Sequence, residues 1–292
     1  MQLARVTIGE KTSVVAKDGG AIRDVTAFFA SDDFVQTLAS LSVNETLAPN
    51  LASYPEVQPD VLTWLTPSAR PQRILCLGFN YRAHAAESGR AVEPPQFPTF
   101  FVRFPSSLVA HGELIEAQSA SDSLDWEGEI AVIIGTAGRD IPRERALDHV
   151  AGYTAFGDDS IRHFQDHSSQ STAGKNFDRT GSYGPWVITA DEVPRPEALE
   201  VKTFVNNQQV QHGRLSDLFF DIPAIIEYVS SWTTLSPGDV IATGTPSGIG
   251  YREDPPRSLH PGDVLRIDIV DHMSLTNEVG FHAAPHTKDD NK

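Results

Sequence analysis

Short runs of hydrophobic residues, separated by polar and glycine-containing turns, follow one another along most of this chain. This pattern is typical of β-strands. The segments RVTIG and TSVVAKDGGAIRDV near the N-terminus predict short strands around a glycine-containing turn. The run ILCLG at residues 74–78 predicts a buried strand, and LDWEGEIAVIIG at residues 124–135 predicts another. The sequence therefore predicts a mainly β protein with some α-helix.

Helical spacing of apolar residues occurs in two segments. In DIPAIIEYVSSW, three isoleucines and Val229 form an apolar stripe, and Asp221 stands before it as a potential N-cap. The second predicted helix is PRERALDHV, which follows the strand at residues 124–135. Two further stretches, LSPGDVIATGT and LHPGDVLRIDI, each predict a Pro-Gly-Asp turn that leads into a strand.

The chain of 292 residues, 40% of them hydrophobic, is long enough to bury a substantial core. Residues 1–70 are predicted to form a small N-terminal α/β domain, and residues 73–282 a larger catalytic domain. The polar residues 283–292 are predicted to form a disordered tail. No constellation of catalytic residues occurs in the N-terminal unit, so the chemistry is expected in the larger domain.

Composition excludes several functional classes. The 39 Asp and Glu against 23 Lys and Arg give a formal net charge of −16, which argues against binding to nucleic acid or to an anionic membrane. An anionic substrate would need local positive charge, from a metal ion or a few basic side chains. The single cysteine, Cys76, lies in an apolar run and permits neither an intrachain disulfide nor a thiolate zinc cluster. With no signal-peptide pattern and no membrane-spanning run, a cytoplasmic protein is expected.

Two glutamates, Glu127 and Glu129, stand two residues apart in the strand predicted at residues 124–135. Side chains alternate across a strand, so both should point from one face, about 7 Å apart, opposite Leu124, Trp126 and the aliphatic residues that follow. One interpretation is an edge strand whose acids are solvated. The other is a divalent-cation site, because Mg²⁺ and Mn²⁺ prefer oxygen ligands and would turn the repulsion between two carboxylates into attraction.

A third acid for such a site is available in the segment AGYTAFGDDS. Asp158 and Asp159 stand there at the junction of an apolar run and a turn. The alternative is an aspartate that hydrogen-bonds the backbone of its own turn. The residues alone leave both interpretations open.

The segment IRHFQDHSSQSTAGKNFD gathers several polar side chains within a short stretch. His163 and His167 have a spacing that would suit zinc on a helix. The glutamate of the zincin pattern is missing, however, so a polar helix face is the favoured interpretation. Lys175 follows Ala-Gly, which lets the backbone approach a ligand, and its ammonium is expected to hold an anionic substrate group beside the cation.

His84 and Glu87 are three residues apart in GFNYRAHAAESG and would be neighbours on a helical turn. They are either a surface ion pair or a base oriented by a carboxylate, in which Glu87 fixes the imidazole tautomer and His84 takes a proton from water. Further along, VIATGTPSGIG predicts a strand followed by a loop whose N–H groups, with the hydroxyls of Thr243 and Thr245, are suited to bind a carboxylate. The loop lacks the Gly-Lys-Ser/Thr ending of a P-loop.

Six motifs occur in order between about Arg73 and about Gly280: GFNYRAHAAESG, FPSSLVAHG, LDWEGEIAVIIG, AGYTAFGDDSIRHFQ, AGKNFDRTGSYGPWVIT and LSPGDVIATGTPSGIG. In these motifs and their spacing the chain resembles the fumarylacetoacetate hydrolase family. The resemblance implies a mixed, rolled-up β-sandwich with few helices. It also implies a homodimer with one Mg²⁺ or Mn²⁺ in each active site.

The resemblance further implies roles for individual residues. The metal ligands of the family correspond to Glu127, Glu129 and Asp158. The His and Glu dyad of its acylpyruvate-cleaving members corresponds to His84 and Glu87, and its active-site Arg, Gln, Lys and Thr correspond to Arg162, Gln165, Lys175 and Thr245. Three positions depart from the family pattern and leave the substrate open: Gly157 stands where many relatives carry Asn, Asp159 where a small apolar residue is common, and Leu215 where Thr is frequent.

The functional hypothesis from the sequence is hydrolysis of a carbon–carbon bond in a β-diketo acid such as an acylpyruvate or fumarylpyruvate. The cation would stabilise an enolate leaving group, while Lys175 and the loop at Thr245 hold the carboxylate. His84, aligned by Glu87, would activate the attacking water. A decarboxylase of an oxaloacetate-like 2-oxo acid, or a 2-hydroxymuconate-type isomerase, would use the same metal site. The remaining alternative is a non-catalytic cation-binding protein, in which neither Lys175 nor the His84–Glu87 pair has a role.

Overall fold

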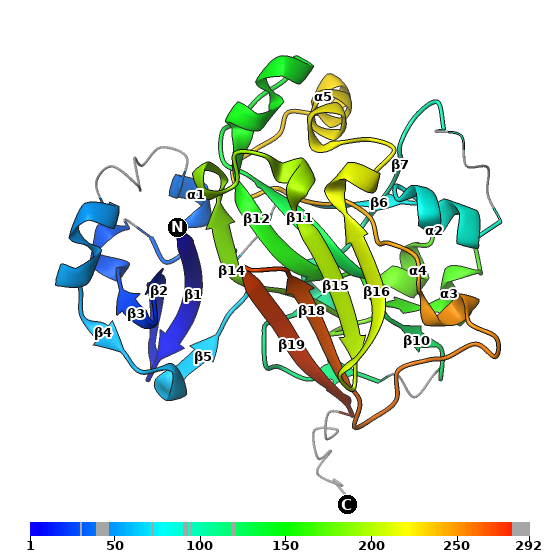
Figure 1. Ribbon diagram of the computed structural model, residues 1–292, viewed down its shortest axis with the longest axis horizontal. Helices are drawn as coiled ribbons and strands as arrows, with labels where there is room; N and C mark the ends of the chain where they lie inside the picture. Colours follow the sequence, from blue (N-terminus) through cyan, green and yellow to red (C-terminus); the bar gives the residue numbers. More distant parts are fainter. Residues whose placement is uncertain are drawn as a thin grey trace, which may run out of the picture.

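Two β-sheets that pack face to face make up most of the structure (Figure 1). The computed structural model describes residues 1–281 except 30, 39–46, 70, 72, 90–92, 94 and 118–120. Within these residues the larger sheet is 12-stranded, the smaller is 5-stranded, and a separate ladder is 2-stranded. Parallel and antiparallel pairs occur together, so the prediction of a mainly β, mixed fold is confirmed.

The larger sheet has the order β4-β3-β2-β1-β14-β12-β11-β17-β6-β7, with β5 paired to β1 and β8 paired to β14. Its strands are β1 (Gln2–Ile8), β2 (Lys11–Asp18), β3 (Ala21–Asp24), β4 (Glu56–Val57), β5 (Leu62–Trp64), β6 (Ile74–Gly78), β7 (Thr99–Val102), β8 (Leu108–Val109), β11 (Gly128–Ile134), β12 (Val150–Gly157), β14 (Gly181–Thr189) and β17 (Val240–Ala242).

The smaller sheet has the order β16-β15-β18-β19-β9 and covers one face of the larger sheet. Its strands are β9 (Ile115–Glu116), β15 (Glu200–Val205), β16 (Gln208–Arg214), β18 (Val264–Ile269) and β19 (Met273–Gly280). The short ladder consists of β10 (Leu124–Asp125) and β13 (Ser160–Ile161). Aliphatic side chains from both large sheets meet in one buried cluster, which includes Ile130, Val132, Ile267 and Leu275.

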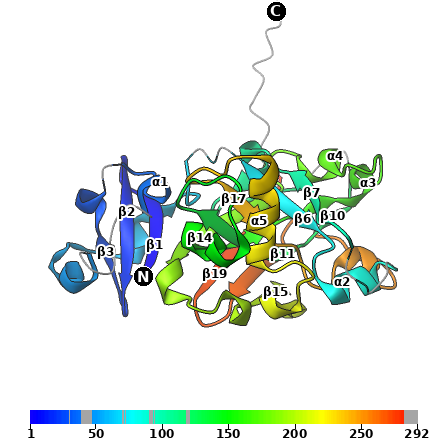
Figure 2. The same ribbon diagram turned by 90° about the horizontal axis from the view of Figure 1, so that it is seen from above.

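The N-terminal strands continue the larger sheet. β1 pairs antiparallel with β14, so that Leu3 stands opposite Val187. Figures 1 and 2 show the β1–β5 unit at one end of the molecule, next to β14. The strands predicted from RVTIG and TSVVAKDGGAIRDV are β1, β2 and β3. The division of the chain into domains at residue 70 stays a prediction.

β11 lies inside the larger sheet, between β12 and β17, and all of its residues are buried. Ile130 and Val132 point into the cluster between the sheets, while Ala131 and Ile133 pack on the opposite face. Burial on both faces explains why IAVII is continuously apolar. The edge-strand interpretation is therefore wrong.

The strand expected over residues 124–135 is interrupted. The chain forms β10 and β11, and the two residues between them, Trp126 and Glu127, belong to neither strand. Leu124 and Trp126 pack in a third cluster with Ile161 and Leu259, so they do not share a face with Ile130 as predicted. The break lets Glu127 depart from the alternation of the strand.

The α-helices are α1 (Val35–Leu38), α2 (Arg82–Glu87), α3 (Arg162–Gln165), α4 (Thr172–Lys175) and α5 (Ile222–Trp232). α5 is the helix predicted from DIPAIIEYVSSW, and the Asp221 carboxylate caps it by accepting a hydrogen bond from the Ala224 N–H at 3.0 Å. The segment PRERALDHV forms a 3₁₀ helix, Arg143–His149, instead of an α-helix. It is short and its N-cap position, Pro142, has no side-chain acceptor, so an α-helical nucleus is not stabilised there.

In the described part of the chain, no helix has the length and apolar character that crossing a membrane requires. The tail predicted at residues 283–292 lies outside the described residues.

Candidate active site

The pairing of β11 with β12 brings the three predicted metal ligands together. Gly128 stands opposite Gly157, so the residues next to them, Glu127 and Asp158, are adjacent, and the Asp158 N–H donates to the Glu127 carbonyl at 2.9 Å. Glu129 follows on β11 itself. One carboxylate oxygen from each of the three acids lies within 4.8 Å of the others. Throughout the described residues, no other group of three or more potential ligand side chains is as close together.

The three acids fit a divalent cation. All are buried, and the Glu129 carboxylate accepts the Gly244 N–H through Oε2 at 2.8 Å while its Oε1 has no hydrogen-bond partner. Burial, and then the nearby Asp158 and Glu127, raise the pKa of Glu129 well above its usual range. An oxygen that is buried, electron-rich and without a proton donor is a suitable ligand for Mg²⁺ or Mn²⁺.

The charges around the three acids also leave room for a cation. The buried carboxyl groups of this cluster are Asp125, Glu127, Glu129, Asp158 and Asp159. The buried cations among them are Arg103, Arg162 and Lys175. With every group ionised, the carboxyl groups would outnumber the cations by two, and one divalent ion would balance this difference.

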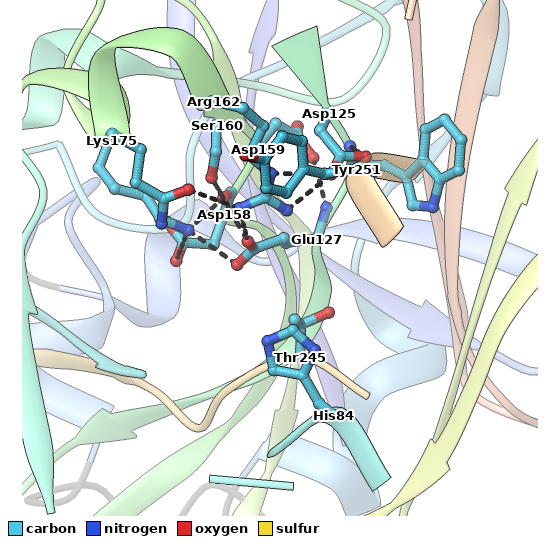
Figure 3. A network of polar contacts seen from close by, with 12 residues as sticks. His84, Asp125, Glu127, Asp158, Asp159, Ser160, Arg162, Lys175, Thr245 and Tyr251 are labelled. Atoms are coloured by element: carbon cyan, nitrogen blue, oxygen red, sulfur yellow. Dashed lines mark hydrogen bonds and ion pairs between the residues drawn. The ribbon is translucent and has the colours of Figure 1, made fainter. Parts of the chain in front are cut away.

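Lys175 contacts the metal-ligand residues directly, as Figure 3 shows. Its Nζ donates to Glu127 Oε2 at 2.7 Å, to Asp158 Oδ2 at 2.7 Å and to the Asp158 carbonyl at 2.9 Å. Although burial opposes ionisation of both groups, this contact raises the pKa of Lys175 and, with Arg162, holds the pKa of Glu127 at about 2. Each ammonium N–H thus has an acceptor on a ligand residue, so the structure gives Lys175 a positioning role. Its predicted grip on the substrate stays a prediction.

Two buried arginines hold the ligand residues from the protein side. Arg162 pairs with Asp125 at 2.7 Å and also with Glu127, and its Nη1 donates to Gln165 at 2.8 Å. Arg103 donates from Nη1 to Asp158 Oδ1 at 2.9 Å. The sequence prediction missed both Arg103 and Asp125. Arg103 ends the apolar run TFFV, but nothing in the sequence nearby identifies its partner, and Asp125 stands in the polar segment SDSLD, which gives no signal.

Asp125 connects this network to the loop after β17. Its carboxylate accepts the backbone N–H of Gly250 at 2.8 Å and that of Tyr251 at 3.0 Å, in addition to the contact with Arg162. Tyr251 therefore lies next to Arg162, whose guanidinium carbon is 5.9 Å from the centre of the tyrosine ring. The metal-ligand cluster and this loop are held as one unit.

His84 and Glu87 form the predicted pair on α2. Nδ1 of His84 lies 3.2 Å from Glu87 Oε2, and Glu87 Oε1 accepts the Gly248 N–H at 2.9 Å. The imidazole stacks on Phe79 with ring centres 5.3 Å apart. His84 is only 6% exposed, so the pair is not a surface ion pair. Figure 3 shows His84 and Thr245 across an open space from Glu127.

The open space is a cavity of about 450 Å³. Six of the nine predicted site residues line it: His84, Glu127, Arg162, Gln165, Lys175 and Thr245. The other three, Glu87, Glu129 and Asp158, stand behind residues that line it. The predicted residues come from five separate segments of the chain that surround one cavity.

The loop after β17 behaves differently from the prediction. The Thr243 hydroxyl donates to the Ile130 carbonyl at 2.8 Å, so it serves the packing of the loop. Thr245 donates to the Gly128 carbonyl at 3.1 Å and accepts from Gln211 at 2.8 Å. The carboxylate that the loop binds is that of Glu129, through the Gly244 N–H. Of the two threonines, Thr245 lines the cavity.

Asp159, which departs from the family pattern, is part of the support of the site. Its Oδ1 accepts the Glu127 N–H at 3.1 Å, and burial raises the pKa of Asp159 to about 8. A Cβ on Gly157 would lie 2.9 Å from Asp159 Oδ2 and 2.5 Å from Ser182 Oγ. The two departures are therefore physically linked, because Asp159 occupies space that a side chain at position 157 would need.

His163 and His167 are both exposed, with ring centres 5.3 Å apart. Among the described residues, no third ligand completes a metal site with them. The structure favours the polar-surface interpretation over a zinc site.

Comparison with known proteins decides the family. Residues 73–280 match the model for the fumarylacetoacetate (FAA) hydrolase C-terminal domain, which is more than half of the chain. The chain belongs to the fumarylacetoacetate hydrolase family. The prediction made from the six motifs is confirmed.

Individual family members resemble this chain over most of its length. The oxaloacetate tautomerase YisK of Bacillus subtilis is 40% identical over 216 residues, which is 73% of this chain and 72% of that protein. The fumarylacetoacetate hydrolase of Exiguobacterium antarcticum matches 97% of this chain and 100% of its own, with a TM-score of 0.87 and 32% identity. The maleylpyruvate hydrolase of Sphingobium sp. SYK-6, solved with manganese(II) and pyruvate, matches the same shares with a TM-score of 0.78 and 27% identity.

The chain therefore belongs to a family of enzymes in which divalent metal ions are used. The buried acids Glu127, Glu129 and Asp158 fit such an ion.

Proposed function

We propose that this protein is a divalent-metal-dependent enzyme that interconverts the keto and enol forms of a 2-oxo acid of the oxaloacetate type. The observation that carries the proposal is the position of His84, a buried histidine held by Glu87, across the cavity from the acidic cluster. Enolisation needs a base beside the carbon and positive charge beside the carbonyl oxygen, and these two requirements are met from opposite walls. The likeness to an oxaloacetate tautomerase supports this reaction.

The proposal assigns metal binding, proton transfer and orientation of the base to different residues. Glu127, Glu129 and Asp158 would hold Mg²⁺ or Mn²⁺, which when bound supplies positive charge that stabilises negative charge on the substrate oxygen. His84 takes a proton from the carbon next to the carbonyl, and the electron pair of that C–H bond moves into the carbonyl to give the enolate. In the opposite direction His84 returns the proton to carbon. Glu87 holds the imidazole in place through Nδ1, which leaves Nε2 to exchange the proton.

Substrate positioning falls to the polar side chains that line the cavity. Arg162 and Gln165 are bonded to each other and face the cavity together. Thr245 also lines the cavity, where its hydroxyl donates to the Gly128 carbonyl. These groups are suited to orient a carboxylate and a carbonyl, which the proposal assigns to them.

A second candidate is the hydrolysis of an acylpyruvate. The same His84–Glu87 pair could direct its proton transfer to water, which would attack the distal carbonyl of a β-diketo acid. The likeness to a maleylpyruvate hydrolase over 97% of this chain favours this candidate. The two reactions differ in whether a carbon–carbon bond breaks, so product analysis separates them.

The test is a substrate panel with wild-type protein, containing the enol form of oxaloacetate and several acylpyruvates, with Mg²⁺, Mn²⁺ or EDTA. The expected result is metal-dependent conversion of the enol form of oxaloacetate to the keto form. The reaction is measured as the decrease in the ultraviolet absorbance of the enol. Pyruvate release from an acylpyruvate at a higher kcat/KM would select the hydrolase instead. Full activity in EDTA would contradict both candidates.

His84→Ala is expected to lower kcat by about 10²-fold or more, because positioned general bases contribute about that much. The control is His163→Ala, which removes an exposed histidine that does not line the cavity. Turnover of His84→Ala close to that of the control would reject the base assignment.

We further propose the homodimer that the family resemblance implies. In the described residues β7 pairs only with β6, and Phe97, Val102 and Phe104 near this strand are exposed. The Asn176 side chain donates to the Val102 carbonyl at 2.9 Å, but no strand of the described residues covers this edge, and an edge strand with exposed apolar side chains is a suitable surface for a second subunit. Light scattering should give twice the chain mass of 31.9 kDa, and a monomer mass would reject this part of the proposal.

A further inference from the structure

The cationic side chains that line the cavity are Arg162, Lys175 and Arg252. The first two already have carboxylate partners in the protein. Arg162 pairs with Asp125 and Glu127, and Lys175 pairs with Glu127 and Asp158. A negatively charged substrate therefore meets little uncompensated positive charge from these two residues.

Arg252 differs from them. Arg252 is an exposed residue that belongs to no ion pair among the described residues, and its guanidinium carbon lies over the Tyr251 ring, 5.3 Å from the ring centre. The backbone of this position is well anchored, because the neighbouring Gly250 and Tyr251 N–H groups donate to the buried Asp125. Arg252 thus stands on a fixed segment of loop with its charge available to a ligand.

Tyr251 places this charge relative to the acidic cluster. Arg162 lies against the same tyrosine ring, at 5.9 Å, and also contacts Glu127. Glu127, Arg162, Tyr251 and Arg252 therefore contact one another in this order, from the metal ligands to the outer arginine. A molecule that reaches from one end to the other would pass along one wall of the cavity.

The other polar groups at this end restrict where an anion can bind. Asp166 also lines the cavity, and its carboxylate accepts a hydrogen bond from the Tyr251 hydroxyl at 2.9 Å. A second anion would be repelled by Asp166 and attracted by Arg252, so Arg252 marks the favourable position. Hydroxyls of Ser168, Ser169 and Ser171, which also line the cavity, suit a polar substrate end.

We infer that Arg252 binds the distal carboxylate of a dicarboxylic 2-oxo acid and is the residue that makes the site prefer diacids over monoacids. This inference rests on the proposed function for the position of the 2-oxo acid end. A planar guanidinium supported by an aromatic ring pairs with a carboxylate through two parallel hydrogen bonds. Discrimination between diacids and monoacids would then come from this one residue.

The test measures binding by calorimetry to magnesium-loaded protein. The ligands are the diacids oxaloacetate, 2-oxoglutarate and 2-oxoadipate, each beside the monoacid of equal length, namely 2-oxobutanoate, 2-oxopentanoate and 2-oxohexanoate. Wild-type protein is expected to prefer at least one diacid over its monoacid by about tenfold or more, the usual size of a charge-assisted hydrogen bond. The length that gives the greatest preference reports the reach to Arg252.

Arg252→Met should abolish this preference and leave the affinity for the monoacids within about twofold, while Arg252→Lys should keep part of it because the charge remains. Arg139→Met is the matched control, since it removes the same charge from an exposed arginine that does not line the cavity. If Arg252→Met weakens monoacids and diacids equally, or wild type does not distinguish them, the inference is overturned while the proposed function stands. If no 2-oxo acid binds at all, the proposed function itself fails.

Discussion

At the scale of single residues, the site depends on close contacts around the turn that carries Asp158. Gly157, before it, has no space for a side chain, because a Cβ would meet Ser182 Oγ at 2.5 Å and Asp159 Oδ2 at 2.9 Å. Asp159, after it, uses its other oxygen to hold the backbone of Glu127. Gly157 and Asp159 therefore depend on each other. A larger residue at position 157 would clash with Asp159, and loss of the Asp159 carboxyl would release the backbone of Glu127.

Gly157→Ala should therefore lower the free energy of unfolding by about 1–3 kcal/mol, the usual cost of overpacking a buried site. In an Asp159→Ala background the same change should cost less, because one of the two clashing atoms is absent. Urea denaturation of the single and double variants measures the coupling between the two positions. Gly20→Ala is the control, since no atom lies within 4 Å of its added Cβ. Strictly additive effects at 157 and 159 would contradict the linkage.

Some residues of the site could be predicted from the amino-acid sequence, and others could not. Glu127, Glu129, Asp158, His84 and Glu87 were predicted because their spacing and motifs are local. Strand pairing then brought the three acids together, and α2 holds His84 beside Glu87. Asp125 and Arg103 act through partners 37 and 55 residues away in the chain, which no local pattern indicates. Lys175 was predicted to bind the substrate. In the structure its ammonium donates to the metal-ligand residues Glu127 and Asp158, because a buried ammonium needs an acceptor for each N–H.

At the scale of elements, α5 shows what periodicity and capping can predict. Its apolar stripe packs into the core and its predicted N-cap is in place. The broken strand at residues 124–134 shows the limit, because alternation continues through Trp126 and Glu127 although the chain leaves the ladder there. Hydrophobic pattern predicts which residues are buried, but the pairing partner decides where a strand ends.

Asp221→Ala should destabilise the protein by about 1 kcal/mol, because the first turn of α5 loses its side-chain acceptor. Asp221 also forms an ion pair with the exposed Arg143, which contributes little at a surface. Asp221→Asn keeps an oxygen at the cap and removes the charge, so it should retain most of the stability. Thermal and urea unfolding of both variants separate the cap from the ion pair. Equal losses in the two variants would show that the ion pair matters more.

The β15–β16 hairpin gives a pH-dependent prediction. Hydrogen bonds from Lys202 and Arg214, with the charge of His212, outweigh partial burial and lower the pKa of Glu200 from 4.5 to about 2. A carboxyl with a depressed pKa in the folded state stabilises the protein above its unfolded value, and this contribution is lost as the pH falls from about 4.5 towards 2. Glu200→Gln should therefore lower the urea midpoint at pH near 6, and the difference should shrink through that acidic window.

The control for this hairpin is Glu227→Gln, an exposed residue on α5. It should change the midpoint little at either pH. A difference between wild type and Glu200→Gln that is constant from neutral to acidic pH would contradict the assigned role of the Glu200 charge.

At the scale of the whole molecule, the fold confines a cluster of like charges between elements that come from distant parts of the chain. Charged groups come from β11, from the residue that follows β12, and from α3 and α4, and the surrounding structure buries them. Taking carboxylates out of water costs free energy unless they are paired. Because the carboxyl groups outnumber the cations here, the protein without metal carries a repulsion that a bound divalent ion relieves.

Glu129→Gln should reveal this balance. Burial and the neighbouring Asp158 and Glu127 already raise the pKa of Glu129, so a neutral amide at this position should leave the metal-free protein as stable as wild type or more stable. Wild type should gain unfolding free energy on addition of Mg²⁺ or Mn²⁺, by about 2.7 kcal/mol when the free metal is near 100 times its Kd. The variant should lose most of this gain, because it lacks one of the three ligand oxygens. Thermal unfolding with EDTA, Mg²⁺ and Mn²⁺ measures both effects.

The control is Glu278→Gln on the exposed face of β19, which makes the same change in net charge. A Glu129→Gln variant that is less stable than wild type in EDTA yet equally stabilised by metal would mean that Glu129 is a structural acid and that the cation is held elsewhere.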